Sequence, residues 1–157
     1  MGIYRFSDRE RRCSLKVITI IVQGQTVGEW VCQKAGGFWT DRSIAIGQIH
    51  NDELVIGVMY DDYTGPSISI HSRCDNPKKV SREFYWAIFN YPFNVLKVKR
   101  LTGLVSTANL KAQRLNEHLG FEREALLKDY LPTGDGIIYV MRPENCRFLK
   151  LGERYAK

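Results

Sequence analysis

Apolar and polar side chains alternate along most of the chain, and this pattern predicts a series of strands interrupted by amphipathic helices. The strand-like stretches span residues 15–23, which is rich in β-branched residues, 43–50, 53–61, 66–73, 98–105, 121–130 and 136–142. Apolar residues at helical spacing predict helices over residues 26–37, 77–90 and 109–119. The closing segment, 143–157, is expected to form an edge strand at 146–151 or a tail.

The order of these elements defines the expected fold. The sequence Asn-Asp-Glu between the second and third strands predicts a hairpin turn. The strand–helix–strand unit over 66–105 should join parallel neighbours through a right-handed crossover. We therefore expect an α/β protein with a mixed, mostly antiparallel central sheet of about six to seven strands and helices on both faces. Residues 1–157 are expected to form one domain, because this length suffices for a single core.

The composition shows that the chain carries an excess of basic residues. The formal net charge of +6 at pH 7 favours an anionic partner, such as nucleic acid, a phosphorylated cofactor or an acidic protein. A solvated basic surface is the alternative explanation. The densest basic groups are RERR at 9–12 and KVKR at 97–100.

The cysteines and histidines do not indicate a metal. The four cysteines include no Cys-x-x-Cys pair, and the three histidines are too scattered to complete a zinc site. We therefore expect reduced thiols and no metal. No stretch reaches the roughly 20 apolar residues of a membrane span, so we expect a soluble protein of the cytoplasm with no membrane partner.

The start of the helix predicted over 77–90 is a candidate anion site. Asn76 is a good N-cap and Pro77 suits the first helical position. The backbone N–H groups of Lys78, Lys79 and Val80 would then lack intrahelical partners and carry the positive end of the helix dipole. With Arg73 and Arg82 nearby, they could hold a phosphate or pyrophosphate. The alternative is that the lysines only cover a solvent-exposed helix start.

Two further polar residues are candidates for the site. Asn109 opens the helix over 109–119 and is either a plain N-cap or a side chain that reaches into a crevice where two parallel strands part. His71 is either a general base or an ordinary polar residue of a strand.

These residues resemble a known family. The segment NLKAQRLNEHLGF, residues 109–121, followed by two strands, is similar to the closing motif of the GNAT acyltransferase superfamily, in which an Asn opens a helix and Leu-Gly-Phe ends it. The order of elements up to Met141 also resembles that fold, over about 130 residues. The stretches FNYPFN, RLTGLVSTAN and ENCRFL look most like short acetyltransferase-like proteins of tailed bacteriophages, which would act in the host cytoplasm.

The resemblance implies an acetyl-CoA-dependent N-acyltransferase that moves an acetyl group to a primary amine of an unidentified acceptor, protein or small molecule. It implies that Asn109 contacts the pantetheine arm of acetyl-CoA in the splay between the strands at 66–73 and 98–105. The start of the following helix, residues 77–80, would hold the pyrophosphate.

The chemistry of direct transfer needs a base, oxyanion donors and an acid. His71 is the candidate base, and backbone N–H groups near Ile70–Ser72 are the candidate donors to the thioester carbonyl. Tyr60, Tyr63 and Tyr130 are candidate acids.

The chain also departs from the family. The family's pyrophosphate loop is rich in glycine, whereas the same place reads SRCDNPKKVSREF with no glycine, so Lys78 and Lys79 must substitute for it. Many members protonate the leaving thiolate with a Tyr at the position of Asn116. Both departures favour an alternative, a catalytically inactive GNAT-fold protein that binds a host protein or nucleic acid. A third hypothesis is a direct nucleic-acid binder that uses RERR and KVKR. The apolar stretch CRFLKL could pair across the edge of a homodimer.

Overall fold

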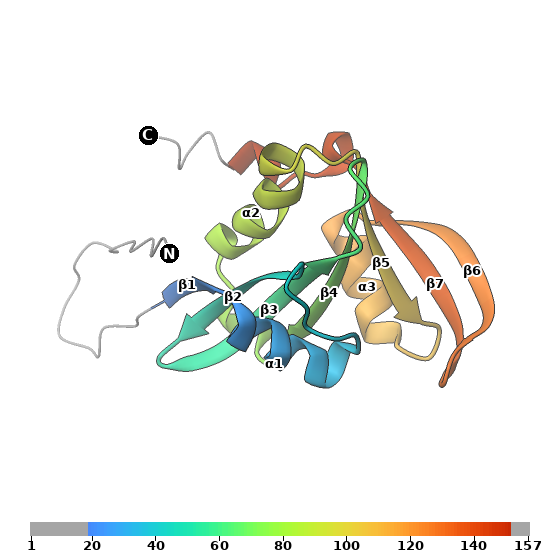
Figure 1. Ribbon diagram of the computed structural model, residues 1–157, viewed down its shortest axis with the longest axis horizontal. Coiled ribbons are helices and arrows are strands. Elements are labelled where there is room, and N and C mark those ends of the chain that lie inside the picture. Colours follow the sequence, from blue (N-terminus) through green and yellow to red (C-terminus); the bar gives the residue numbers. More distant parts are fainter. Residues whose placement is uncertain (1–18, 152–157) are drawn as a thin grey trace. The chain divides into compact units, whose positions relative to one another are not determined.

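The computed structural model describes residues 19–151 (Figure 1). Its strands are β1 Thr19–Gln23, β2 Ile44–His50, β3 Glu53–Asp61, β4 Ser67–Cys74, β5 Arg100–Ser106, β6 Glu122–Leu131 and β7 Gly134–Met141. Its α-helices are α1 Gln25–Ala35, α2 Arg82–Asn90 and α3 Leu110–Leu119. Within this described range, the helices are all too short or too polar to cross a bilayer.

The strands form one mixed sheet of seven strands in the order β1-β2-β3-β4-β5-β7-β6. The pairs β1–β2, β5–β7 and β6–β7 are antiparallel, whereas β4 and β5 are parallel. The α/β fold class and the parallel crossover over 66–105 are therefore confirmed. Asn51 and Asp52 adopt positive φ angles of 49° and 65°, as the tight hairpin between β2 and β3 requires.

The chain divides into two compact units. Among the described residues, unit 1 consists of residues 19–59 and 71–85, and unit 2 of residues 60–70 and 86–151. Strand β4 passes from unit 2 to unit 1 between Ile70 and His71. Residues 15–18 of the first predicted strand and the basic group RERR lie outside the described residues.

The core of unit 1 lies between α1 and the neighbouring strands. Val27 and Val31 of α1 are buried against Ala45 of β2 and Met59 of β3, and Trp30 and Trp39 pack on this cluster. Burial of large apolar side chains is the main stabilising contribution in such a core. α1 therefore lies on the sheet through the face that carries its valines.

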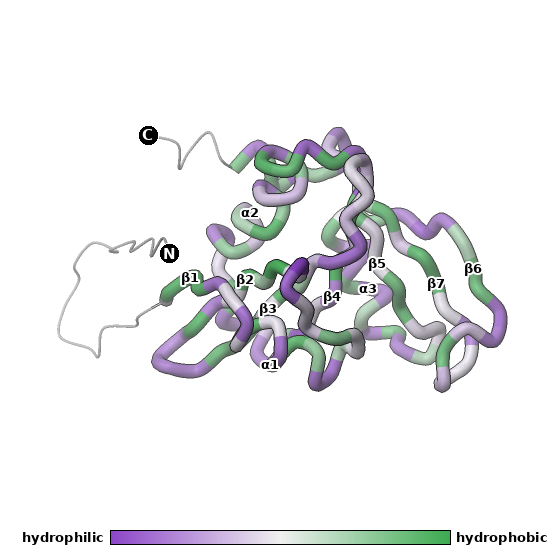
Figure 2. The backbone as a smooth tube through the Cα atoms, viewed as in Figure 1, coloured by the Kyte–Doolittle hydropathy of each residue, from purple (hydrophilic) through white to green (hydrophobic). Residues whose placement is uncertain are grey.

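Unit 2 places α3 against β5 and β7, with β6 alongside (Figure 1). Its large buried side chains include Leu101, Phe89, Tyr139 and Met141. The predicted stop of α3 at Gly120 is confirmed, because Gly120 has a φ of 104° and its N–H donates to the carbonyls of Asn116 and Glu117. β6 is the edge strand, and hydrophilic stretches flank its apolar centre (Figure 2).

Two predicted elements are wrong. The helix predicted over 77–90 starts at Arg82; residues Pro77–Lys79 form only a short 3-10 turn. The amide of Gln48, a fully buried side chain of β2, is responsible for this break. Its Nε2 donates to the Lys79 carbonyl at 2.6 Å, and its Oε1 accepts from the Ser81 N–H at 2.8 Å. Ser81 then caps α2 through a hydrogen bond from the Phe84 N–H.

The edge strand predicted at 146–151 is also wrong. Pro143–Asn145 and Leu149–Leu151 form 3-10 turns, in which Cys146, Leu149 and Leu151 donate backbone hydrogen bonds to carbonyls three residues earlier. Phe148 stacks on Phe89 with ring centroids 5.4 Å apart. The apolar residues of this segment are therefore used in helical turns that cover the core of unit 2, and the strand that was predicted to pair across a dimer edge does not form within residues 146–151.

Candidate functional site

The parallel ladder between β4 and β5 is unusually short. It pairs Ser67 with Arg100, Ile68 with Leu101 and Ser69 with Thr102, and it does not extend to Ile70 and Gly103. A Cβ built on Gly103 would lie 3.8 Å from the Ile70 Cγ2 and 3.9 Å from the Ile70 carbonyl oxygen. The two strands therefore stop pairing at Ile70, one residue before His71, although β5 remains paired with β7 as far as Ser106.

Asn109 follows the end of β5 and opens α3. Its Oδ1 accepts a hydrogen bond from the Ala112 N–H at 3.1 Å, so it is the N-cap of the helix. Within the described residues, its Nδ2 makes no hydrogen bond. The cap is supported by Gln113, a buried side chain whose Nε2 donates to the carbonyls of Ser106 and Thr107. Asn109 is thus fixed at the N-terminus of α3, and its Nδ2 amide group remains available to a ligand.

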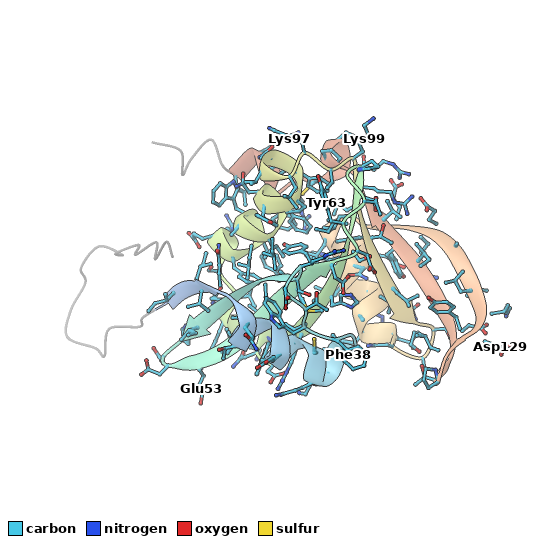
Figure 3. The ribbon with its side chains drawn as sticks, viewed as in Figure 1. Phe38, Glu53, Tyr63, Lys97, Lys99 and Asp129 are labelled. Carbon is cyan, nitrogen blue, oxygen red and sulfur yellow. The ribbon has the colours of Figure 1, made fainter. Side chains whose placement is uncertain are left out.

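His71 lies beside Gly37, the second of two glycines that follow α1. Gly36 and Gly37 have φ angles of 77° and 84°, which favour glycine. A Cβ built on Gly37 would lie 3.7 Å from the Cε1 of the His71 ring, so the backbone of this turn passes close to the imidazole. The next residue, Phe38, is 86% exposed (Figure 3). Unit 1 therefore presents an imidazole and an exposed aromatic ring on adjoining segments.

The segment between β4 and α2, residues 75–81, contains the residues that the sequence predicts to hold the pyrophosphate. Five of its backbone N–H groups are already paired within unit 1, and within the described residues the Lys78 N–H makes no hydrogen bond. Asp75 and Asn76 both donate to the Val55 carbonyl, at 2.9 and 3.2 Å. The other donors are Lys79, to the Asn76 carbonyl, Val80, to the Pro77 carbonyl, and Ser81, to the Gln48 side chain. These amides are not aimed at an external anion.

Arg73 is held by an ion pair within the same segment. Its guanidinium donates to the Asp75 carboxylate from Nε at 3.1 Å and from Nη2 at 2.7 Å. Its Nη1 donates to the Trp30 carbonyl and to Gln33, and its Cζ lies 3.9 Å from the centre of the Trp30 ring. Only 12% of the Arg73 side chain is exposed. Hydrogen bonds from Arg73, and next from Lys34, lower the pKa of Asp75 to about 2, so its carboxylate is charged at neutral pH.

The lysines of this segment have ammonium groups without an ion-pair partner. Lys78 is exposed and Lys79 is half-buried, and neither forms an ion pair with a residue of the described range. Arg82, at the start of α2, is exposed and also unpaired among these residues. The side chains of Lys78, Lys79 and Arg82 therefore supply positive charge that can reach a ligand here.

The three candidate tyrosines differ in their availability. Tyr60 is fully buried, and its hydroxyl donates to the Ile88 carbonyl. Burial, and next the neighbouring Tyr91, raise the pKa of Tyr60 well above its usual value. Tyr63 and Tyr130 are 55% and 60% exposed. Tyr60 is therefore a structural hydroxyl, and only the two exposed phenols can give a proton to an external group.

Three residues of this region were missed from the sequence. Gln48, Trp30 and Asp75 fix the segment 75–81 and the Arg73 side chain, but they come from β2, α1 and the loop itself. No periodicity in the sequence indicates that the Gln48 side chain binds the backbone of Ser81, which lies 33 residues later. The acidic Asp75 two residues after Arg73 was the only local signal for the ion pair.

Several known structures are similar to this chain. A protein from T. thermophilus assigned as an acetyltransferase is 21% identical with a TM-score of 0.57; the match covers 68% of this chain and 62% of that chain, less than two thirds of it. A variant of the spermidine N-acetyltransferase SpeG from Vibrio cholerae is 17% identical with a TM-score of 0.59, over 71% of this chain and 70% of that chain. N-acetyltransferase PseH from Campylobacter jejuni is 19% identical with a TM-score of 0.53, over 66% and 70%.

No protein-family model matches the sequence, and no curated protein matches it significantly. At these low identities the similar structures show the fold alone. The chain has the GNAT acyltransferase fold, as its resemblance predicted.

Proposed function

We propose that this protein is an acetyl-CoA-dependent N-acyltransferase that transfers an acetyl group to a primary amine. The observation that carries this proposal is the parallel β4–β5 ladder that ends after Ser69–Thr102, followed by Asn109 at the start of α3. Ligands of open α/β sheets bind where neighbouring strands part, beyond their carboxyl ends. The names of the similar structures support an amine as acceptor.

The proposed reaction is direct transfer. The amine nitrogen attacks the thioester carbonyl, the new C–N bond forms, the C–S bond breaks and the thiolate leaves. His71 takes the proton from the amine, directly or through water, while backbone N–H groups around Ile70 and Ser72 stabilise the oxyanion. Either Tyr63 or Tyr130 gives a proton to the thiolate, because the Tyr60 hydroxyl is buried and bound to Ile88.

The residues fit the two halves of acetyl-CoA differently. The Asn109 Nδ2 can donate to an amide carbonyl of the pantetheine arm while its Oδ1 still caps α3. For the pyrophosphate we propose the side chains of Lys78 and Lys79, because the Val80 N–H donates to Pro77 and Arg73 is bound to Asp75. Arg73 would contribute only the long-range charge of an ion pair that is already formed.

A second candidate is a catalytically inactive GNAT-fold protein that binds an acidic protein or nucleic acid. The pairing of five backbone amides of residues 75–81 favours it, because it leaves fewer N–H groups for a phosphate. The net charge of +6 and the exposed Phe38 would then serve a macromolecular partner. The basic group KVKR at 97–100 would be part of such a surface.

Calorimetric titration of acetyl-CoA into the protein separates the two candidates. We expect binding that weakens in the Lys78→Ala/Lys79→Ala double variant and is unchanged in a matched Lys111→Ala/Lys150→Ala variant on exposed positions of unit 2. Release of free thiol in the presence of amines, spermidine among them, then tests transfer. Absence of binding at millimolar acetyl-CoA would reject the enzyme and favour the binding protein.

A further inference from the structure

The buried side chain of Gln113 binds the turn that leads from β5 to Asn109. Only 5% of Gln113 is exposed, although glutamine is a residue of protein surfaces. Its Nε2 donates to the Ser106 carbonyl at 3.2 Å and to the Thr107 carbonyl at 2.8 Å. Its backbone N–H donates to the Asn109 carbonyl at 3.1 Å. A single residue of α3 therefore contacts both ends of the turn 106–109.

The position of Asn109 depends on one of these carbonyls. The Ser106 carbonyl that binds the Gln113 side chain also accepts a hydrogen bond from the Asn109 backbone N–H, at 2.9 Å. A carbonyl oxygen has two lone pairs and can accept from both donors. Rotation of the Ser106 peptide group would shift the backbone of Asn109, and with it the direction of the Asn109 Nδ2. Gln113 therefore fixes this direction without a contact to the Asn109 side chain.

Arg123 of β6 fixes the orientation of the Gln113 amide. Its Nη2 donates to the Gln113 Oε1 at 3.2 Å. Because a guanidinium only donates and a carbonyl only accepts, the amide oxygen must face Arg123 and the Nε2 must face the turn. Arg123 is itself bound, because its Nε donates to Glu117 at 2.7 Å and its Cζ lies 5.8 Å from the centre of the Tyr139 ring. All of these residues belong to unit 2.

We infer that Gln113 is a positioning residue of the proposed enzyme: together with Arg123, it sets the direction in which Asn109 presents its Nδ2 to the pantetheine arm. This inference rests on the proposed function and concerns the Asn109 contact alone. Both N–H groups and the oxygen of the Gln113 amide are bound within unit 2. The effect of Gln113 on the donor therefore passes through Asn109.

The first test is calorimetric titration of coenzyme A into a Gln113→Leu variant. The substitution keeps much of the volume and removes the hydrogen bonds to Ser106 and Thr107. We expect the Kd to rise about tenfold, as for the loss of one hydrogen bond to the ligand. Phe89→Leu, in the core of unit 2, is the control: it should lower stability in urea unfolding and leave the Kd unchanged.

The inference and the proposed function can fail separately in this titration. If Gln113→Leu binds coenzyme A with the Kd of the unsubstituted protein, the inference is overturned and the proposed function stands. If the unsubstituted protein itself does not bind coenzyme A, the proposed function fails and the inference fails with it.

A double variant separates positioning from a loss of stability. If Gln113 acts only through Asn109, its substitution should have no further effect on binding once the Nδ2 donor is gone. The Kd of Asn109→Asp/Gln113→Leu should therefore equal that of Asn109→Asp. General loosening of unit 2 would instead weaken binding in both backgrounds, and the two factors would multiply to about a hundredfold. That result would overturn the inference.

An Arg123→Ala variant carries the test if Gln113→Leu does not fold. The Arg123 side chain is 54% exposed, and its truncation leaves the buried Gln113 amide in place but free to rotate. We expect the Kd for coenzyme A to rise several-fold, and not to rise further when Asn109→Asp is also present. Arg114→Ala, an exposed arginine of α3 without an ion pair in the described part of the chain, should leave the Kd unchanged. An unchanged Kd in Arg123→Ala would overturn the part of the inference that concerns Arg123.

Hydrogen exchange measures the turn without any ligand. In Arg123→Ala the Asn109 backbone N–H should exchange faster than in the unsubstituted protein, because its acceptor, the Ser106 carbonyl, is less firmly fixed. The Gly120 N–H, at the other end of α3, should keep its exchange rate. Equal rates at Asn109 in the two proteins would show that the turn is fixed without the oriented amide, and would overturn the inference.

Discussion

The Arg73 guanidinium and the Asp75 carboxylate form a two-point ion pair, with Nη2 2.7 Å from Oδ2 and Nε 3.1 Å from Oδ1. Two side chains two residues apart thus fix each other at the end of β4, and Lys34 of α1 joins them from the other side of the carboxylate. Ion pairs therefore stabilise the loop between β4 and α2, whereas in a phosphate-binding loop the bound ligand would do so. The strength of this pair can be measured through pH.

The pKa of Asp75 is lowered from 3.8 to about 2 by hydrogen bonds from Arg73 first and Lys34 second. A carboxyl whose pKa is lower in the folded state stabilises the protein above its unfolded pKa, and this contribution is lost as the pH falls from about 4 to about 2. Because 35% of the side chain is exposed, solvent screening limits the effect to about 1 kcal/mol. Asp75→Asn should lower the free energy of unfolding by this amount at pH 7, and by nothing near pH 2, in denaturant titrations. Asp41→Asn, in an exposed loop of unit 1, is the control and should leave the free energy of unfolding at pH 7 unchanged.

Gly28 is a site where packing should outweigh helix propensity. A Cβ on Gly28 would lie 2.0 Å from the Cε3 of Trp39, which packs on the core of unit 1. Gly28→Ala gains about 0.5–1 kcal/mol in a helix, but forcing this ring out of its place costs about 1–3 kcal/mol. We expect a net loss of about 1–2 kcal/mol in urea unfolding, and less than about 0.5 kcal/mol for the exposed Thr26→Ala on the same helix. A stabilised Gly28→Ala variant would show that the ring moves freely.

Gln48 should be the most sensitive polar residue of unit 1. Replacing it by Leu keeps much of the volume but leaves the Lys79 carbonyl and the Ser81 N–H without their partner. Unpaired groups of this kind cost about 1–3 kcal/mol, so we expect a loss of about 2 kcal/mol and faster hydrogen exchange at Ser81. Gln23→Leu, at the exposed end of β1, is the control and should be nearly neutral. Unchanged hydrogen exchange at the Ser81 amide in Gln48→Leu would mean that the Gln48 side chain does not fix the segment 75–81.

The strands and helix ends that carry local signals could be predicted from the sequence. The Asn51-Asp52 turn, the stop of α3 at Gly120 and the cap at Asn109 depend on the backbone conformation of one or two residues, which their own residue types favour. Alternating apolar residues placed β2 to β5 to within about two residues, because period-two burial is itself local. The parallel pairing of β4 and β5 followed from connection rules.

The errors came from contacts between distant parts of the chain. Asn76 and Pro77 form a good local helix start, yet Gln48 holds Lys79 and Ser81 and moves the start of α2 to Arg82. The segment 146–151 has a strand-like pattern of apolar residues, but Phe148 stacks on Phe89 and the segment forms helical turns instead. The same kind of contact decides the candidate site, because Trp30 and Gln33 hold Arg73 from 43 and 40 residues away.

His71 is the proposed base, and its removal should affect transfer and not folding. His71→Ala should lower kcat by about 10²–10⁴-fold, the usual contribution of a positioned general base. His118→Ala, an exposed histidine of unit 2 next to Arg147, is the matched control and should leave kcat unchanged. An unchanged kcat at saturating substrate in His71→Ala would show that another group takes the proton.

Asn109 combines two roles that two substitutions can separate. Its Oδ1 caps α3 by accepting from Ala112, whereas the proposed contact with the pantetheine arm needs its Nδ2 to donate. Asn109→Asp keeps an oxygen at the cap, so stability should be retained, but it removes the donor, so the Kd for coenzyme A should rise about tenfold. Asn109→Ala should weaken binding equally and also lose about 1 kcal/mol of stability, measured by denaturant unfolding. If Asn109→Asp binds coenzyme A with the affinity of the unsubstituted protein, Asn109 acts only as the helix cap. Other groups of β4 and β5 must then bind the pantetheine arm.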